Sequence, residues 1–298
     1  MKLPYLGESL ALLTAVVWAS SVILFRKSGE SVHPLALNLF KTLLAVVLML
    51  PTLWITQLKL IQNVPVNDYL LLIFSGILGI ALADTLFFKS LNLLGASVIA
   101  IVDCLYSPFV IIMSYFWLGE LMTGVQFIGT ALIISALLAV THTKGRGSLP
   151  LRTLLYGLLL SSSSLAMMVV GIVVIKPLLE RTPLLWALEI RLMAAGIGLL
   201  IILLFSRERR EIVQTLYSQR KWRFTLLGSF LGAYLSTMLW MAGMKFTKAS
   251  VAGALNQTAN IFIFIFAAVF LKEPINRVRL IAIVLAVGGA FLVFFGGS

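Results

Sequence analysis

Long apolar runs constrain this chain more than any other feature of its sequence. A hydrocarbon core about 30 Å thick is crossed by about 20 apolar helical residues, at about 1.5 Å per residue. Ten stretches meet this criterion, near residues 8–26, 34–56, 68–90, 94–118, 122–142, 153–175, 182–205, 222–244, 248–271 and 278–296. The sequence therefore predicts an all-α integral membrane protein with ten transmembrane helices.

The composition fits a protein that lies almost entirely in a bilayer. Apolar residues make up 60% of the chain, charged residues only 11%, and the mean hydropathy is +1.06. Soluble domains do not have such a composition. The connections between runs are short, so no soluble domain is expected. We predict a multi-pass protein of the cell's inner (plasma) membrane, monomeric or homodimeric, with the lipid bilayer and a small-molecule substrate as partners.

The net charge of +12 is carried by the loops between the apolar runs. Of the 23 lysines and arginines, 15 lie in the odd-numbered loops and 6 in the even-numbered ones or at the N-terminus; the other two are Lys41 and Arg191, within spans. Positive-inside reasoning places the odd-numbered loops, including residues 206–223, in the cytoplasm and both termini outside. Because the basic residues lie in membrane loops, nucleic acid is not expected as a partner.

Targeting and redox signals are few. Residues 8–26 follow Lys2, but no small-residue cleavage site comes after them, so we expect this run to be a retained helix. Cys104, the single cysteine, excludes an internal disulfide.

The two halves of the chain align with each other. A shift of 153 residues pairs residues 95–120 with residues 248–273 without a gap, and a shift of 150 pairs Arg26 with Lys176 and Lys41 with Arg191. We infer two homologous five-helix repeats, residues 1–146 and 147–298. Since five is odd, the second repeat enters the membrane from the opposite side, which gives the inverted-repeat architecture of many secondary transporters.

Three segments resemble the EamA-type exporters of the drug/metabolite transporter superfamily. They are 18-WASSVILFRK-27, 107-SPFVIIMSYFWLGELMTGVQFIGTALIISALLAV-140 and 259-ANIFIFIFAAVFLKEPINRVRLIAIVLAVGGAFLV-293. The resemblance covers both halves and implies a ten-helix, two-repeat carrier that exports amino acids or related small metabolites. The chain departs from the family pattern at three positions: Ile261 replaces a proline, Lys272 a glycine, and Lys41 an arginine.

Local signals predict how the paired helices end and begin. Thr123 and Gln126 form a capping-box pattern that starts the fifth span, and Asn276 occupies the equivalent position in the second half. We expect Gly119-Glu120 and Lys272-Glu273 to end tight helical hairpins. Pro108 lies mid-span and removes the hydrogen bond to the carbonyl near Cys104, which indicates either a kink that faces a cavity or ordinary helix bending.

Polar residues inside the fourth and ninth spans predict a central site. Asp103, Tyr106 and Ser107 share one helix face, and so do Asn256, Gln257 and Asn260. The repeat register maps Asp103 onto Asn256 and Ser107 onto Asn260. Because polar groups in hydrocarbon are costly, these should face each other or a wet cavity.

Five charged residues lie well inside the spans, away from the span ends: Lys41, Asp84, Asp103, Glu189 and Arg191. Lys41 and Arg191, which share a repeat position, could bind a substrate carboxylate, for which arginine is better suited. The alternative is a structural ion pair with Asp84, Asp103 or Glu189, or snorkelling to the interface. Proton coupling through any of the three carboxylates is a hypothesis.

Two aromatic residues, Phe87 and Trp240, share a repeat position and, with Trp18, lie deep in their spans. They could line a cavity for an apolar solute or an organic cation. Plain helix packing is the alternative.

We do not expect this protein to be an enzyme. The only histidines, His33 and His142, lie in loops, and no metalloprotease, nucleophile-elbow or phosphate-loop pattern occurs. No cofactor or metal is predicted. We expect a secondary-active or facilitative carrier for amino acids or similar metabolites, with multidrug or hydrophobic-cation efflux, or a non-catalytic scaffold, as alternatives.

Overall fold

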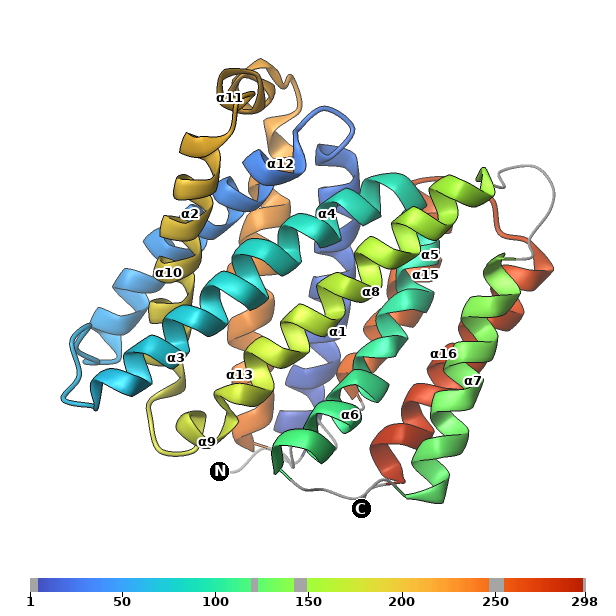
Figure 1. The fold of residues 1–298 in the computed structure, drawn as a ribbon, viewed down its shortest axis with the longest axis horizontal. Helices are drawn as coiled ribbons and strands as arrows, with labels where there is room; N and C mark the ends of the chain where they lie inside the picture. Colours follow the sequence, from blue (N-terminus) through green and yellow to red (C-terminus); the bar gives the residue numbers. More distant parts are fainter. Residues whose placement is uncertain (1–4, 119–122, 142–148, 247–254, 297–298) are drawn as a thin grey trace.

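A computed structural model describes residues 5–118, 123–141, 149–246 and 255–296. In these ranges the chain forms helices joined by short connections (Figure 1). The first half contains α1 (Leu6–Ser28), α2 (Pro34–Ile55), α3 (Val66–Gly76), η1 (Ile77–Leu82), α4 (Ala83–Leu94), α5 (Ala96–Val102), η2 (Asp103–Leu105), α6 (Tyr106–Leu118) and α7 (Gly124–Thr141). The second contains α8 (Leu151–Val174), α9 (Lys176–Leu179), α10 (Leu184–Phe205), α11 (Arg209–Ser218), α12 (Trp222–Ser229), η3 (Phe230–Leu235), α13 (Ser236–Phe246), α15 (Ala259–Phe270) and α16 (Arg277–Phe295).

The all-helical membrane fold is confirmed. Eight helical stretches in the described ranges are long and apolar enough to cross a bilayer, and residues 124–140 and 255–270 form two shorter apolar helices. The number of ten spans stays a prediction, because these two are shorter than a full crossing requires. The predicted repeat boundary at 146/147 and the hairpin end at Gly119-Glu120 lie outside the described residues.

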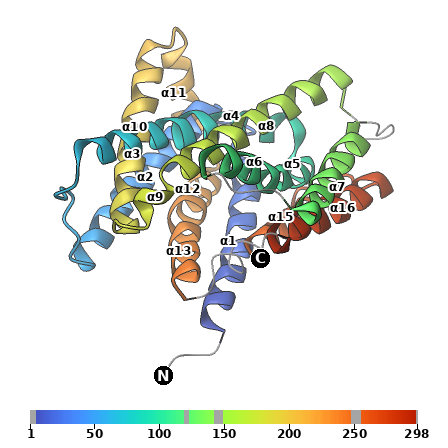
Figure 2. The same cartoon turned by 60° about the horizontal axis from the view of Figure 1, so that its bottom comes forward.

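The two halves pack on each other reciprocally. Helix α1 contacts α12, η3, α13 and α15 of the second half, while α8, its counterpart, contacts α3, η1, α4 and α6 of the first half. The remaining counterparts pair with each other: α2 packs on α10, the fourth span packs through α5 on α15 of the ninth span, and α7 packs on α16. Figures 1 and 2 both show α7 and α16 as a pair at one side of the bundle. Such reciprocity is what a pseudo-two-fold axis between two repeats produces.

Matching helix distortions occur in both halves. Ile77–Leu82 and Phe230–Leu235 are π-helical, and the two segments are 153 residues apart, as the sequence register predicts. A π-helical turn shifts the backbone hydrogen bonds and is frequently found at functional sites. The fourth span is likewise interrupted by the 3-10 turn η2, and a turn at Thr258 interrupts the ninth span at the equivalent position. The predicted break near Cys104 and Pro108 is thus confirmed.

Asn38 stabilises the π-helical segment of the first half. Its side chain is fully buried, and its amide nitrogen donates to the carbonyl oxygens of Ile80 and Ala81, both at 3.0 Å, and to Thr85 Oγ1 at 2.9 Å. Thr42 Oγ1 donates to its amide oxygen at 3.3 Å. One side chain from α2 therefore donates to carbonyl groups where the helix deviates from α-geometry. Because the bilayer core contains no water, such carbonyls need a donor from the protein itself.

The predicted caps are present. Gln126 Oε1 accepts from the Thr123 amide at 2.9 Å, and Thr123 Oγ1 accepts from the Gln126 amide at 3.3 Å, which completes the capping box. Asn276 Oδ1 accepts from the Arg279 amide at 2.8 Å and so caps α16. Lys272, in the place of a family glycine, has a positive φ of 55°.

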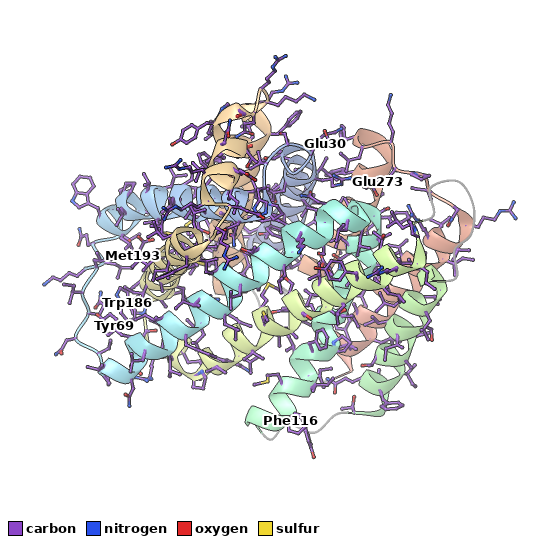
Figure 3. The ribbon with its side chains drawn as sticks, turned by 45° about the horizontal axis from the view of Figure 1, so that its top comes forward. Glu30, Tyr69, Phe116, Trp186, Met193 and Glu273 are labelled. Atoms are coloured by element: carbon purple, nitrogen blue, oxygen red, sulfur yellow. The ribbon has the colours of Figure 1, made fainter. Side chains whose placement is uncertain are left out.

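Glu273 ends a hairpin, as predicted, and it also caps a helix of the other half. Its carboxylate accepts from the backbone amides of Ala96 at 2.8 Å and Ser97 at 2.9 Å, and from Ser97 Oγ at 2.5 Å. It lies at the end of α4, where α5 begins (Figure 3). Gly95 has a φ of 81°, and a Cβ there would lie 2.7 Å from the Glu273 carboxylate. A carboxylate at the N-terminus of α5 satisfies its free amides and favours the helix dipole.

A second, smaller core holds the α2–α3 connection. Tyr69 and Trp186 pack edge to face with ring centroids 5.3 Å apart (Figure 3), and Trp186 Nε1 donates to the Leu60 carbonyl at 2.8 Å. Arg181 pairs with Asp68 at 2.6 Å. These contacts fix the end of α10 that carries Glu189 and Arg191.

Glu273→Gln should lower stability because a neutral amide cannot replace the charged acceptor of three hydrogen bonds. We expect a loss of about 2 kcal/mol, seen as a lower unfolding temperature of the purified protein in detergent. Glu180→Gln, which alters an exposed glutamate, serves as the control. Equal unfolding temperatures for the two variants would contradict the capping role.

Asn38→Ala should destabilise the first π-helical segment because the Ile80 and Ala81 carbonyls lose a buried donor. The expected cost is about 2 kcal/mol, measured by the same unfolding assay. Asn63→Ala removes an exposed asparagine and should change stability little. If Asn38→Ala unfolded at the control's temperature, the amide would not be supporting the segment.

Candidate functional site

The site begins with a buried ion pair between α2 and α4. Lys41 is only 7% exposed, and its Nζ donates to Asp84 Oδ2. The same ammonium lies 5.7 Å from the ring centroid of Phe88. The helices meet here because Asn38, one turn before Lys41, holds the π-helical segment that precedes α4. Of the alternatives for Lys41, the structure shows the ion pair, with Asp84 as the partner.

Arg191 occupies the repeat position of Lys41 but has a different environment. It lies on α10, where Gly76 allows close contact: a Cβ there would be 2.3 Å from the Arg191 carbonyl oxygen. Its charge interacts with that of Asp84, and Tyr106 lies nearby. Its Nε is buried and has no hydrogen-bond partner within the described chain. By the repeat register the counterpart of Asp84 is Thr237, so the second half offers Arg191 no equivalent carboxylate.

Two hydrogen bonds join the broken fourth and ninth spans. Gln257 Nε2 donates to Ser107 Oγ at 2.7 Å, and Asn260 Nδ2 contacts Cys104 Sγ at 3.3 Å. Under the 153-residue register Ser107 corresponds to Asn260 and Cys104 to Gln257. Each hydrogen bond is therefore the repeat counterpart of the other, and the pseudo-two-fold axis passes between them. Ser107, Gln257 and Asn260 are 2%, 9% and 4% exposed, so the contact is buried.

Unsatisfied oxygens lie beside this contact. Asp103 Oδ1 and Asn256 Oδ1, which are repeat counterparts, are both buried without a hydrogen-bond partner in the described ranges. Tyr106, at the start of α6, lies near the Arg191 guanidinium. A buried polar atom without a partner is costly in a resting protein and is common where a ligand or water binds.

Aromatic side chains border the ion pair. Trp18 and Phe87 have ring centroids 6.3 Å apart, Phe87 contacts Phe88 at 5.6 Å, and Phe88 contacts Phe25 at 4.9 Å. Trp240, on α13, makes no ring contact with Phe87 in the part of the chain that the structure describes. The aromatic cluster is therefore asymmetric and belongs to α1 and α4.

Sequence reasoning missed the residues that hold the site in place. Asn38, Phe88 and Ser164 belong to this group; Ser164 Oγ donates to the Ala83 carbonyl at 2.7 Å. An asparagine inside an apolar run was the available signal for Asn38. Glu189, considered as ionisable but not as part of the site, is fully buried on α10, and neither carboxylate oxygen has a partner among the described residues.

The fold and these residues define a polytopic membrane protein whose two related halves share a buried polar centre, which is the plan of a secondary transporter. The sequence profile of the EamA-like transporter family matches residues 5–141 and 155–295. The chain belongs to that family. It is a multi-pass transporter of the inner or plasma membrane.

Several relatives are also transporters, and a solved structure shares the fold. An uncharacterized transporter of Archaeoglobus fulgidus is 26% identical over 275 residues, 92% of each chain. One from Methanothermobacter thermautotrophicus is 26% identical over 78% of this chain and 66% of its own, and one from Bacillus subtilis is 32% identical over 46% and 41%. A crystal structure with 19% identity has a TM-score of 0.64 over 96% of this chain and 95% of its own, which shows a shared fold.

Lys41→Ala should destabilise the protein because it leaves Asp84 partly buried without its cation. We expect a cost of about 3 kcal/mol, and a smaller cost in the double variant Lys41→Ala/Asp84→Ala, where both charges are absent. Unfolding of the four proteins of this double-mutant cycle measures the coupling. Additive losses would show that the two side chains do not interact.

Proposed function

We propose that this protein exports small metabolites, amino acids above all, by alternating access around the polar centre shared by its two halves. The observation that carries the proposal is the pair of repeat-related contacts, Ser107 with Gln257 and Cys104 with Asn260. They support a centre on the pseudo-two-fold axis, where a rocking motion of the halves would expose the same groups to either side.

Arg191 is our candidate for the group that binds the substrate carboxylate. Its guanidinium is partly buried and its Nε lacks a partner in the described structure, whereas the Lys41 ammonium is paired with Asp84. A guanidinium also offers two parallel donors that match a carboxylate. Of the two repeat-related cations, Arg191 is therefore the one with hydrogen-bonding capacity to spare.

The ammonium group of an amino acid requires hydrogen-bond acceptors, and an apolar side chain requires apolar surface. Asp103 and Asn256 supply oxygens that lack partners, and Trp18 with Phe87 supplies ring faces. Together these groups suit a solute that carries both charges and a hydrophobic side chain. The same rings and carboxylates favour a hydrophobic cation as the second candidate substrate.

The helix distortions that recur in both halves are our candidates for the points where the helices bend during transport. The π-helical segments and the breaks at η2 and Thr258 recur at the same repeat positions. The breaks at η2 and Thr258 adjoin Cys104 and Gln257, so irregular backbone flanks the polar centre in both halves. In the present conformation Ser107, Gln257 and Asn260 are buried, so we assign it to a closed state of the cycle.

Coupling to protons is the mechanism we propose for energy input, with Asp84, Asp103 and Glu189 as the carboxylates concerned. All three lie within spans, where a proton neutralises a costly charge. We also propose the orientation that the loop charges indicate, with both termini outside. Figure 1 shows both termini at the end of the bundle opposite α11.

Arg191→Gln should reduce transport more than tenfold, because the substrate carboxylate would lose its charged donor. The assay is uptake of a labelled amino-acid panel into liposomes that contain the purified protein, with and without a pH gradient. Arg277→Gln, at an exposed arginine, is the matched control and should transport normally.

Several outcomes would count against the proposal. If folded protein moves no amino acid but accumulates a hydrophobic cation, the second candidate substrate replaces the first. If Arg191→Gln transports as well as Arg277→Gln, Arg191 does not bind the substrate. Unchanged dependence on the pH gradient in Asp84→Asn, Asp103→Asn and Glu189→Gln would exclude these carboxylates from coupling.

A further inference from the structure

The helix α11, between α10 and α12, is fixed against the end of the bundle. Ile212 on its inner face is only 5% exposed. Thr215 Oγ1 accepts from the His33 backbone amide at 3.0 Å. Gln219 is the first residue after the helix, and its side-chain oxygen accepts from Thr225 Oγ1 at 2.6 Å. Figure 1 shows α11 at the tip of the bundle, above α10 and α12. This connection is therefore an ordered amphipathic helix at the level where the transmembrane helices end.

An open groove of about 460 Å³ lies between α11 and the last turn of α10. Its lining residues are of two kinds. The apolar ones are Leu203, Leu204 and Val213, and the polar or amphipathic ones are Arg209, Arg210, Gln214 and Tyr217. The groove therefore presents a hydrocarbon wall from the membrane helix and cationic groups from the interfacial helix.

The charges at the groove are positive. Arg209 and Arg210 are exposed, and Arg209 uses one nitrogen to donate to the Leu204 carbonyl at 3.2 Å, which holds its guanidinium over the end of α10. Acidic side chains of the described chain do not line the groove; Glu208 interacts instead with His33. An anionic group in the groove would therefore meet two cations.

The surface around the groove exposes large apolar and aromatic side chains. Phe205, which ends α10, is 86% exposed, Leu204 is 62% exposed, and Tyr217 is 75% exposed. Large apolar side chains at the end of a transmembrane helix remain exposed in the isolated chain because acyl chains cover them in the bilayer. The groove thus opens at the boundary between acyl chains and head groups.

We propose that this groove binds an anionic phospholipid. Its phosphate lies between Arg209 and Arg210, Tyr217 contacts the glycerol region, and an acyl chain follows Leu203, Leu204 and Val213. A phosphate is matched by arginine donors, and basic interfacial helices attract anionic lipids. A free phosphate would leave the apolar wall unused, which is why a lipid is the better occupant. The proposal is independent of the transported solute.

The test is native mass spectrometry of the purified full-length protein with increasing phosphatidylglycerol. Arg209→Gln/Arg210→Gln should bind the lipid at least about tenfold more weakly than the unmodified protein. Arg207→Gln/Arg220→Gln removes the same charge from exposed arginines of the same connection that do not line the groove, and it should bind within about twofold of the unmodified protein.

Three results would overturn the proposal. Equal loss in both double variants would indicate unspecific attraction by the net charge of the connection. Equal binding of phosphatidylcholine would exclude recognition of the anion. Displacement of the lipid by glycerol phosphate at similar concentrations would show a site for a soluble anion. The unfolding temperatures of both double variants verify that each remains folded.

Discussion

The hydrogen-bonding requirement of backbone in a hydrocarbon solvent is the constraint on which the rest of this structure depends. No water is available in the membrane interior to pair with a free carbonyl or amide, so regular helices are the default and every departure needs a substitute partner. The departures occur at the π-helical segments and at the broken fourth span. Around the first of these, Asn38 and Ser164 supply donors from neighbouring helices. The positions where the helices are irregular are therefore also positions where hydrogen bonds join neighbouring helices.

Polar side chains follow the same requirement, and it brings the two halves together. A buried amide, hydroxyl or charge without a partner is costly, so many of these groups pair with a group on a facing helix. Ser107 with Gln257, and Glu273 with the start of α5, are contacts between halves that are distant in sequence. Contacts of this kind fix how the two repeats are oriented relative to each other. Arg191, Asp103 and Asn256 retain unsatisfied atoms at the centre, and such atoms are what a solute can bind.

The membrane boundary imposes a different requirement, which α11 meets. At this level the solvent changes from acyl chains to charged head groups within a few ångströms, and an amphipathic helix presents an appropriate surface to each. Ile212 faces the protein while Arg209 and Arg210 face outward. The concentration of basic residues in this connection, visible in the sequence as a topological signal, thus also gives the surface a preference for anions.

The sequence by itself determined the helical membrane class, the two repeats and their register, because hydrophobic length and self-similarity are properties of consecutive residues. It also placed the cap at Thr123 and the break near Pro108, since capping and proline effects act within one or two turns. Which side chains meet was decided only by the tertiary structure. The sequence left Lys41 three possible carboxylates, and the crossing of α2 with α4 selected Asp84. The sequence shows an asparagine within an apolar run but not what Asn38 binds, because a π-helical turn has no clear local signal and its stabilising donor comes from another helix. Partner choice depends on how helices cross in three dimensions, and that geometry is set by the packing of the whole bundle.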